Sequence, residues 1–232
     1  MKLIAGIDGS KGGWVSVSAN VNNDQDPEFN IYENFKDISR KDLELILVDM
    51  PIGLEKELFK GGRVVDREAR RALIKGKSSI FNSPSRLALK AKDYQEANEI
   101  NKSQGMGLSK QSWFLFKKIK EVDDFLKLQN RPQVFESHPE LVFQTMKGGA
   151  IEFKKSTREG LAERIGLLLM NGFNEKFLNQ FIGKKSKLYK DDDFLDACSL
   201  LWSARRVKQN KEIKIPDEIF KDEKGIIMQM KI

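Results

Sequence analysis

The stretch KLIAGIDGSKGGWVSVSANV, residues 2–21, decides the fold of this chain. Lys2 to Asp8 is a short apolar run that ends in one aspartate, and Trp14 to Val21 alternates between two sets of side chains. Both patterns are typical of strands, the second of a strand whose two faces differ. The glycine-rich segment GSKGG, residues 9–13, lies between them. We therefore expect an antiparallel hairpin whose first strand is central in a sheet.

Two more strands and a second strand-ending aspartate follow. The polar segment 22–27 predicts a turn, Phe29 to Phe35 a third strand, and residues 36–42 a short helix. Glu44 to Met50, ELILVDM, is almost continuously apolar up to Asp49, which is typical of a parallel strand covered on both faces. The sequence thus predicts an α/β fold whose mixed sheet starts β-β-β-α-β and is flanked by helices.

The rest of the chain predicts helices around this sheet, in one domain spanning residues 1–232. Residues of about 55–130 are polar and largely helical in pattern, and we expect a large helical insertion there. The further predicted elements are helices near 64–75, 90–101, 110–128, 157–170, 175–181 and 191–207, a strand at Gln133 to Glu136, and a hairpin at the end of the chain.

Composition and charge bound the class of protein. Cys198 is the single cysteine, which excludes an intramolecular disulfide and favours a reducing cytosol. The start of the chain lacks the apolar run of an export signal, and no stretch reaches the roughly 20 apolar residues of a membrane span. We therefore expect a cytoplasmic protein that does not cross a membrane. Lys and Arg number 41 against 34 Asp and Glu, and this net charge of +7 favours nucleic acid as a partner.

Acidic residues occur at positions that a fold of this kind brings together. Asp8 and Asp49 end two predicted strands, and ligands of open α/β sheets bind beyond the carboxyl ends of strands. On the last long helix, Asp193 and Asp196 are three residues apart and share a face, while Asp192 and Asp196 form a competing pair. Capping of the helix N-terminus explains one or two of these aspartates but not Asp196, which lies deeper in the helix.

Carboxylates that converge in this way require a cation or a raised pKa. Two like charges 4 Å apart repel by about 4 kcal/mol at an effective dielectric constant of 20. Oxygen ligands without clustered histidine or cysteine favour Mg²⁺ or Mn²⁺ over zinc. Two such ions about 3.5–4 Å apart stabilise the attacking and leaving oxygens of a phosphodiester. The sequence therefore predicts a two-metal-ion carboxylate site.

Several segments carry a resemblance to a known family. They are GIDGSKGGWV (6–15), VDMPIGL (48–54), DREARR (66–71), SSIFNSPSR (78–86), GLSKQSWFLFKKIKEVD (107–123), FESHPELVF (135–143) and DDFLDACSLLWSARR (192–206). In this order they resemble domain-of-unknown-function family 429, whose members are described as predicted ribonuclease-H-like nucleases. The resemblance implies a ribonuclease-H-like core and a nuclease activity.

The same resemblance implies roles for individual residues. It places Asp8 on the first strand, Asp49 on the fourth, and an acidic pair on the last helix. The DFLDA segment is similar to the DxxDA ending of Holliday-junction resolvases, which favours Asp193 with Asp196 over Asp192. Glu136 ends its own strand and is expected as a further catalytic carboxylate or as a support for one.

Basic and aromatic residues in the matching segments complete the candidate site. His138, the only histidine, is either a base, metal ligand or substrate-binding group or a structural residue, and Glu140 shares that alternative. The candidates for binding the phosphates of a nucleic acid are Arg67, Arg70, Arg86 and Lys117, with Lys77 beside them. For Trp14, Phe81 and Trp113, core packing is favoured over stacking on bases.

These residues lead to one expected function and two alternatives. We expect a nuclease that hydrolyses phosphodiester bonds of DNA or RNA with Mg²⁺ or Mn²⁺ held by Asp8, Asp49, Asp193 and Asp196. A non-catalytic nucleic-acid-binding protein would keep the fold without the turnover. The glycines around Asp8 are also similar to the phosphate-binding turn of sugar-kinase and actin-like ATPases, so ATP-dependent phosphotransfer is the other alternative, although the chain is short for the two domains of that class.

Overall fold

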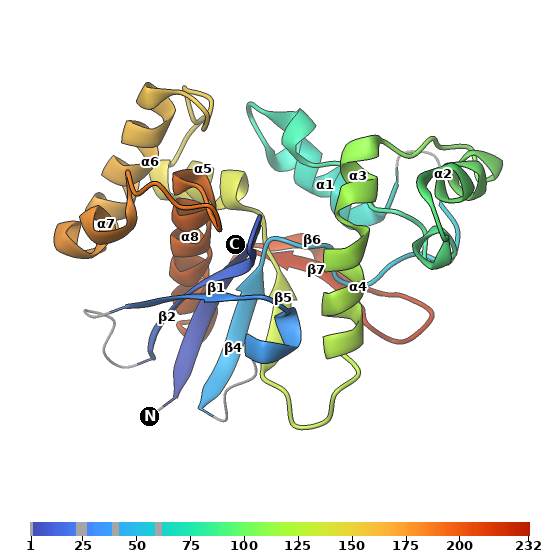
Figure 1. The fold of residues 1–232 in the computed structure, drawn as a ribbon, viewed down its shortest axis with the longest axis horizontal. Coiled ribbons are helices and arrows are strands. Elements are labelled where there is room, and N and C mark those ends of the chain that lie inside the picture. Colours follow the sequence, from blue (N-terminus) through green and yellow to red (C-terminus); the bar gives the residue numbers. More distant parts are fainter. Residues whose placement is uncertain (1, 22–26, 39–41, 59–61) are drawn as a thin grey trace.

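The computed structural model describes residues 2–21, 27–38, 42–58 and 62–232, and its centre is a mixed sheet (Figure 1). Within these residues seven strands pair in the order β3-β2-β1-β4-β5-β7-β6. Strands β1, β4, β5 and β7 are parallel, and β2, β3 and β6 are antiparallel to their neighbours. The strands are β1 Leu3–Ser10, β2 Gly13–Asn20, β3 Glu28–Tyr32, β4 Leu43–Val48, β5 Gln133–Glu136, β6 Lys214–Lys221 and β7 Ile227–Lys231. The predicted α/β class, the mixed sheet and the terminal hairpin are confirmed.

The first hairpin forms as predicted, with a shorter turn. Residues Leu3 to Ser10 pair with Asn20 to Gly13, so β1 continues two residues past Asp8. The expectation that Asp8 ends its strand was therefore wrong for the pairing of β1 with β2. On the other side, the parallel pairing with β4 ends at Ile7 and Val48. Asp8 thus lies just beyond the last pair that joins the two central strands.

The helices lie on both faces of the sheet (Figure 1). They are α1 Val64–Ala72, α2 Tyr94–Ser103, α3 Lys110–Phe114, α4 Phe116–Phe125, α5 Pro139–Lys147, α6 Arg158–Met170, α7 Glu175–Phe181 and α8 Asp191–Lys208, with 3₁₀ turns η1 Phe35–Ile38, η2 Lys77–Ser79 and η3 Ala88–Lys90. Helix α8 packs on β1, β2 and β4, with α5 and α6 behind it. Apolar residues of α4 and η1 cover the opposite face. No helix in the described part of the chain has the length and apolar character that a membrane crossing requires.

Some predicted boundaries were wrong. The third strand ends at Tyr32, and the short helix expected at 36–42 is a 3₁₀ turn, with residues 39–41 outside those described. Of the predicted turn at 22–27, residues 22–26 also lie outside them. The helix expected at 110–128 is broken at Leu115, and α5 was not predicted. The segment of about 55–130 contains α1 to α4, of which α1 packs on β6 and β7 and α4 on the sheet face opposite α8.

Helix α8 lies directly against the sheet at Gly6. A Cβ atom added there would lie 2.1 Å from the backbone nitrogen of Leu201 and 2.2 Å from the carbonyl oxygen of Ala197. Both atoms belong to the backbone of α8, which cannot give way as a flexible side chain can. The glycine in β1 therefore lets α8 lie directly on the central strand, and this contact sets the height of the helix above the sheet.

A buried ion network fixes the chain beyond β4 and β5. Arg63 is 0% exposed and donates to Asp66 Oδ1 at 2.6 Å and to Glu136 Oε1 at 2.8 Å. It also donates to the carbonyl oxygens of Ile52 and Gly53 at 3.0 and 2.8 Å. Ile52 N–H in turn donates to Glu136 Oε2 at 2.8 Å. One guanidinium thus connects the segment after β4, the end of β5 and the start of α1.

We predict that Gly6→Ala lowers the free energy of unfolding by about 1–3 kcal/mol, because the added methyl group overlaps the α8 backbone. Urea unfolding followed by circular dichroism measures this change. Gly166→Ala in α6 is the control, since no atom lies within 4 Å of the position that its added methyl group would take. The control should be neutral or slightly stabilising. Equal stabilities for the two variants would contradict the close contact.

We predict that Arg63→Met destabilises the fold by about 3–5 kcal/mol, because Asp66 and Glu136 lose the cation that compensates their burial. Arg71→Met, on the same helix, removes a pair with Glu68 in which the arginine side chain is 72% exposed. That control should cost less than about 1 kcal/mol. The unfolding curves of Arg63→Met and Arg71→Met should therefore differ clearly. Overlapping curves would contradict the structural role of Arg63.

Candidate active site

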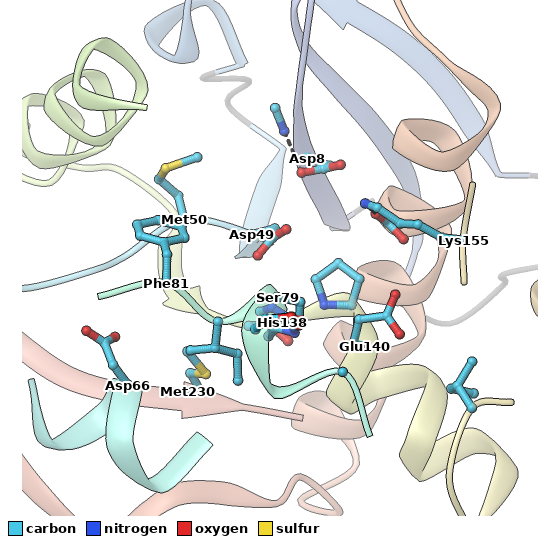
Figure 2. Close-up of a pocket in the computed structure, with 18 of the residues that line it drawn as sticks. Asp8, Asp49, Met50, Asp66, Ser79, Phe81, His138, Glu140, Lys155 and Met230 are labelled. Carbon is cyan, nitrogen blue, oxygen red and sulfur yellow. Dashed lines mark hydrogen bonds and ion pairs between the residues drawn. The ribbon is translucent and has the colours of Figure 1, made fainter. Parts of the chain in front are cut away.

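A pocket of about 620 Å³ opens beyond the carboxyl ends of β1, β4 and β5 (Figure 2). Asp8, Asp49 and the segment from Glu136 to Glu140 line it from the sheet. One wall comes from the segment after α1, which includes Ile80 and Phe81, and the other from Ile151 to Lys155, between α5 and α6. The position matches the expected location of a ligand site in an open α/β sheet.

The backbone pairing of the central strands places Asp8 beside Asp49. Asp49 N–H donates to the carbonyl oxygen of Ile7 at 3.0 Å, so each aspartate follows the last residue of the β1–β4 ladder. Asp8 is buried, and its Oδ1 accepts a hydrogen bond of 2.7 Å from Gly9 N–H. Asp49 is partly buried and lies next to Asp8 in the pocket (Figure 2).

Helix α8 brings Asp196 to the same pocket. Asp196 is 1% exposed, and its Oδ2 accepts from Lys155 Nζ at 2.8 Å. Asp192 lies one turn earlier, with its Oδ2 at 3.6 Å from the same ammonium. Asp193 instead caps its own helix, because its Oδ2 accepts from Lys190 N–H at 2.9 Å. The pair expected from spacing is thus divided between a pocket residue, Asp196, and a capping residue, Asp193, which does not line the pocket although its charge acts on Asp8.

Three aspartates that line this pocket, Asp8, Asp49 and Asp196, have raised pKa values. Burial, followed by the charges of Asp49 and Asp196, raises the pKa of Asp8 well above its usual value. Burial raises the pKa of Asp49 to about 6 and that of Asp196 to about 6, while the ammonium of Lys155 opposes both shifts. Burial also raises the pKa of Asp193. Such a set of mutually repelling, buried acids is characteristic of functional sites.

The oxygen donors of the pocket suit a hard divalent cation, but they are not arranged as a closed chelate. Asp196 Oδ1 is buried and has no hydrogen-bond partner, which leaves a carboxylate oxygen available to a ligand. Within the described residues, no three Asp, Glu, His or Cys side chains are grouped closely enough to hold a metal ion as they stand. Lys155 lies among the carboxylates instead (Figure 2).

His138 and Glu140 also line the pocket, at the start of α5. His138 is buried, its Nδ1 has no hydrogen-bond partner, and burial lowers its pKa below the usual value, so the ring is neutral at pH 7. Glu140 is paired with Arg164, whose Nη2 lies 2.6 and 2.8 Å from the two carboxylate oxygens. The histidine is thus available to a ligand, and the glutamate is largely neutralised.

Glu136 lines the pocket, but its carboxylate is bound by Arg63 and by the backbone after β4. Both of its oxygens accept from Arg63, and one also accepts from Ile52 N–H. These contacts leave Glu136 as a support for the strand end that carries His138, rather than as a member of the group around Lys155.

The predicted phosphate-binding residues lie in three different places. Arg67 and Arg70 line a second cavity of about 440 Å³, together with Arg71, Lys77 and Asn82. Arg86 is buried, where it pairs with Asp222 and, at 2.9 Å, with Asp123. Lys117 is on the surface, with its side chain 81% exposed and 4.0 Å from Glu121. None of the four lines the carboxylate pocket itself.

Two lysines near the carboxylates were missed by the sequence analysis. Lys155 lies in a loop where nothing in the sequence distinguishes it from Lys154. Lys118 donates to the carbonyl oxygen of Gly13, lies over the Trp14 ring, and is close enough to Asp8 for that charge to raise its pKa against the lowering effect of burial. The signal that could have marked Lys118 is its place in the family-matching segment 107–123.

The aromatic candidates divide as follows. Trp14 is fully buried and packs edge-on against Phe35, and Trp113 packs against Phe116, as expected for core residues. Phe81 instead lines the pocket (Figure 2). Cys198 is buried, as a small apolar residue of α8 would be.

Comparisons with known proteins place the chain in a family without identifying an activity. Neither the curated proteins nor the solved structures include a significant match. The model of the family described as "Protein of unknown function (DUF429)" matches residues 6–219, which confirms the resemblance seen in the sequence. By this match over most of its length, the chain belongs to the DUF429 family.

Proposed function

We propose that this protein is a metal-dependent nuclease that hydrolyses phosphodiester bonds of nucleic acid at the carboxylate pocket, within a ribonuclease-H-like arrangement of the sheet. The observation that carries the proposal is the burial of Asp8, Asp49 and Asp196 around one cation. Three buried carboxylates with raised pKa values are costly to the fold, and a ligand of positive charge relieves that cost.

Each side chain has a role in this proposal. Asp8, Asp49 and Asp196 are the ligands for Mg²⁺ or Mn²⁺, with Asp193 at the edge of the same group. The bound ion would activate a water molecule and stabilise charge on the phosphate. His138, neutral and with an unpartnered Nδ1, is suited to hydrogen-bond with the substrate or the attacking water.

The neighbouring cations support nucleic acid as the substrate. The segment after α1 contributes Gly76 and Ser78 to the carboxylate pocket, and Lys77 and Asn82 to the second cavity. The two cavities therefore share a wall. A polynucleotide bound at the carboxylates would meet Arg67 and Arg70 when its next phosphates cross this wall.

One observation favours a second candidate function. The carboxylates do not form a chelating group within the described residues, and Lys155 already compensates part of their charge. A nucleic-acid-binding protein without catalysis would have the same basic cavity and would not need the ion. Cleavage of nucleic acid in Mg²⁺ or Mn²⁺ separates these two candidates.

We predict that the purified protein cleaves members of a panel of single strands, duplexes, hybrids and branched junctions in Mg²⁺ or Mn²⁺, and that Asp8→Asn lowers the rate at least about 100-fold because an ion ligand is lost. Asp124→Asn, which changes an exposed aspartate on α4, is the control and should cleave normally. Gel electrophoresis of labelled substrates measures both.

The outcomes identify the alternatives. Binding of nucleic acid without cleavage by the wild type, unchanged in Asp8→Asn, would favour the non-catalytic protein. Stabilisation by ATP with no effect of any polynucleotide would favour phosphotransfer. Cleavage that survives in Asp8→Asn would refute the proposed site.

We predict that the pocket aspartates give the metal-free protein a contribution to stability that is lost as the pH rises from about 4 to above 6. A carboxyl group whose pKa is about 6 in the folded state and 3.8 when unfolded binds more protons in the folded state across this window. Protonation there favours folding, and the contribution disappears once the folded group ionises. Thermal unfolding at a series of pH values should show that Asp49→Asn declines less than the wild type, by on the order of 1 kcal/mol.

The matched control for this series is again Asp124→Asn. The Asp124 pKa is lowered by Lys120 and Lys127, so its removal should leave the decline in place. Excess Mg²⁺ at pH 7.5 should restore the stability of the wild type more than that of Asp49→Asn. Parallel stability profiles for the wild type and Asp49→Asn would show that the pKa of Asp49 is not raised in the folded protein.

A further inference from the structure

Lys155 has the position of a bound cation rather than that of a surface lysine. Its Nζ lies 2.8 Å from Asp196 Oδ2 and 3.6 Å from Asp192 Oδ2. The charges of Asp8 and Asp49 also act on it, and its side chain is 44% exposed although Asp196 beneath it is buried. The ammonium thus lies beside the carboxylates in the pocket, near Asp8 in the view of Figure 2.

The backbone around Lys155 is fixed by helix α6. Glu163 accepts hydrogen bonds of 3.1 Å from the N–H groups of Glu152 and Phe153. The carbonyl oxygen of Lys154 lies 1.9 Å from where a Cβ of Gly160 would be, so a glycine is required there for the loop to pack on the helix. The position of Lys155 at the carboxylates is therefore built into the fold.

The charges in the pocket limit the number of ions it can hold. Asp8, Asp49 and Asp196 carry three negative charges when ionised, and Lys155 reduces the net charge to minus two. One divalent ion balances the charge of these four groups, whereas two ions would also need the charge of Asp192, whose Oδ2 lies 3.6 Å from the same ammonium. Glu140 adds little to the balance because Arg164 binds both of its oxygens.

The hydrogen bond from Lys155 also occupies one of the oxygens that a second ion would need. Two ions in one carboxylate site share a bridging carboxylate that uses both of its oxygens. Asp196 Oδ2 is occupied by Lys155, while Asp196 Oδ1 has no partner. Asp8 Oδ1 accepts from Gly9 N–H. An ion bound at the open Asp196 Oδ1 would therefore not be bridged to a second ion by the Asp196 carboxylate.

We infer that Lys155 takes the place of a second metal ion, so that this pocket binds one divalent cation together with the Lys155 ammonium. The inference rests on the proposed function of the same site, and it replaces the two-ion arrangement expected from the sequence. Lys155 is here a charge-compensating residue that keeps Asp196 Oδ2 occupied.

Isothermal titration of the full-length protein with MnCl₂ at pH 7.5, checked by the electron paramagnetic resonance signal of free Mn²⁺, tests the inference without any substrate. We expect one equivalent for the wild type and for Lys155→Arg, which keeps the charge. Lys155→Ala should bind a second equivalent, because Asp196 Oδ2 and one negative charge become available. Lys154→Ala, the neighbouring lysine in the same wall, is the matched control and should bind one.

The number of bound Mn²⁺ ions separates a failure of the Lys155 inference from a failure of the proposed function. Two equivalents in the wild type, or one in Lys155→Ala, would overturn the role of Lys155 and leave the proposed nuclease site intact. No Mn²⁺ binding by any variant, together with no cleavage, would overturn the proposed function itself. If Lys155→Ala does not fold by circular dichroism, Lys155→Gln takes its place, and the stoichiometry of the wild type alone still tests the inference.

Discussion

The contact between Gly6 of β1 and the backbone of α8 is the constraint on which the rest of the site depends. No side chain separates the helix from the central strand there, since a Cβ would overlap Ala197 and Leu201. The turn of α8 that precedes this contact holds Asp196, and the strand residues that follow Gly6 lead to Asp8. Close packing of one helix on one strand therefore brings two carboxylates, distant in sequence, into one pocket.

This packing has an electrostatic cost, and the fold compensates it only in part. Burial raises the pKa values of Asp8, Asp49 and Asp196, and the charges of neighbouring acids raise them further. The Lys155 ammonium lowers these pKa values and so offsets part of the shift. A protein selected for stability alone would place apolar side chains at such positions. The presence of three acids here, one of which has an unpartnered oxygen, Asp196 Oδ1, favours the interpretation that the pocket binds a ligand.

The sequence predicted those parts of the site that depend on local patterns. Strand periodicity located Asp8 and Asp49, and helical spacing included Asp196, because both rules describe the backbone that carries the residue. The capping rule set Asp196 apart, but it could not identify Asp193 as the capping residue, since capping depends on the backbone conformation at Lys190. They gave no means of finding Lys155, whose position depends on how a loop packs on α6, or of recognising that Arg86 is buried between Asp123 and Asp222.

The type of cation paired with each acid separates the acids that hold the fold from those that are available to a ligand. Glu136 and Asp66 are bound by Arg63, a rigid guanidinium that is fully buried and contacts both at once. Asp196 is bound through one oxygen by a half-exposed lysine, which is a flexible point charge. A cation that bound Glu136 would have to break its buried hydrogen bonds with Arg63. A cation that bound Asp196 could use Oδ1, which has no hydrogen-bond partner. Two acidic clusters that share the carboxyl edge of one sheet thus differ in how open they are to a ligand, because their counter-charges differ.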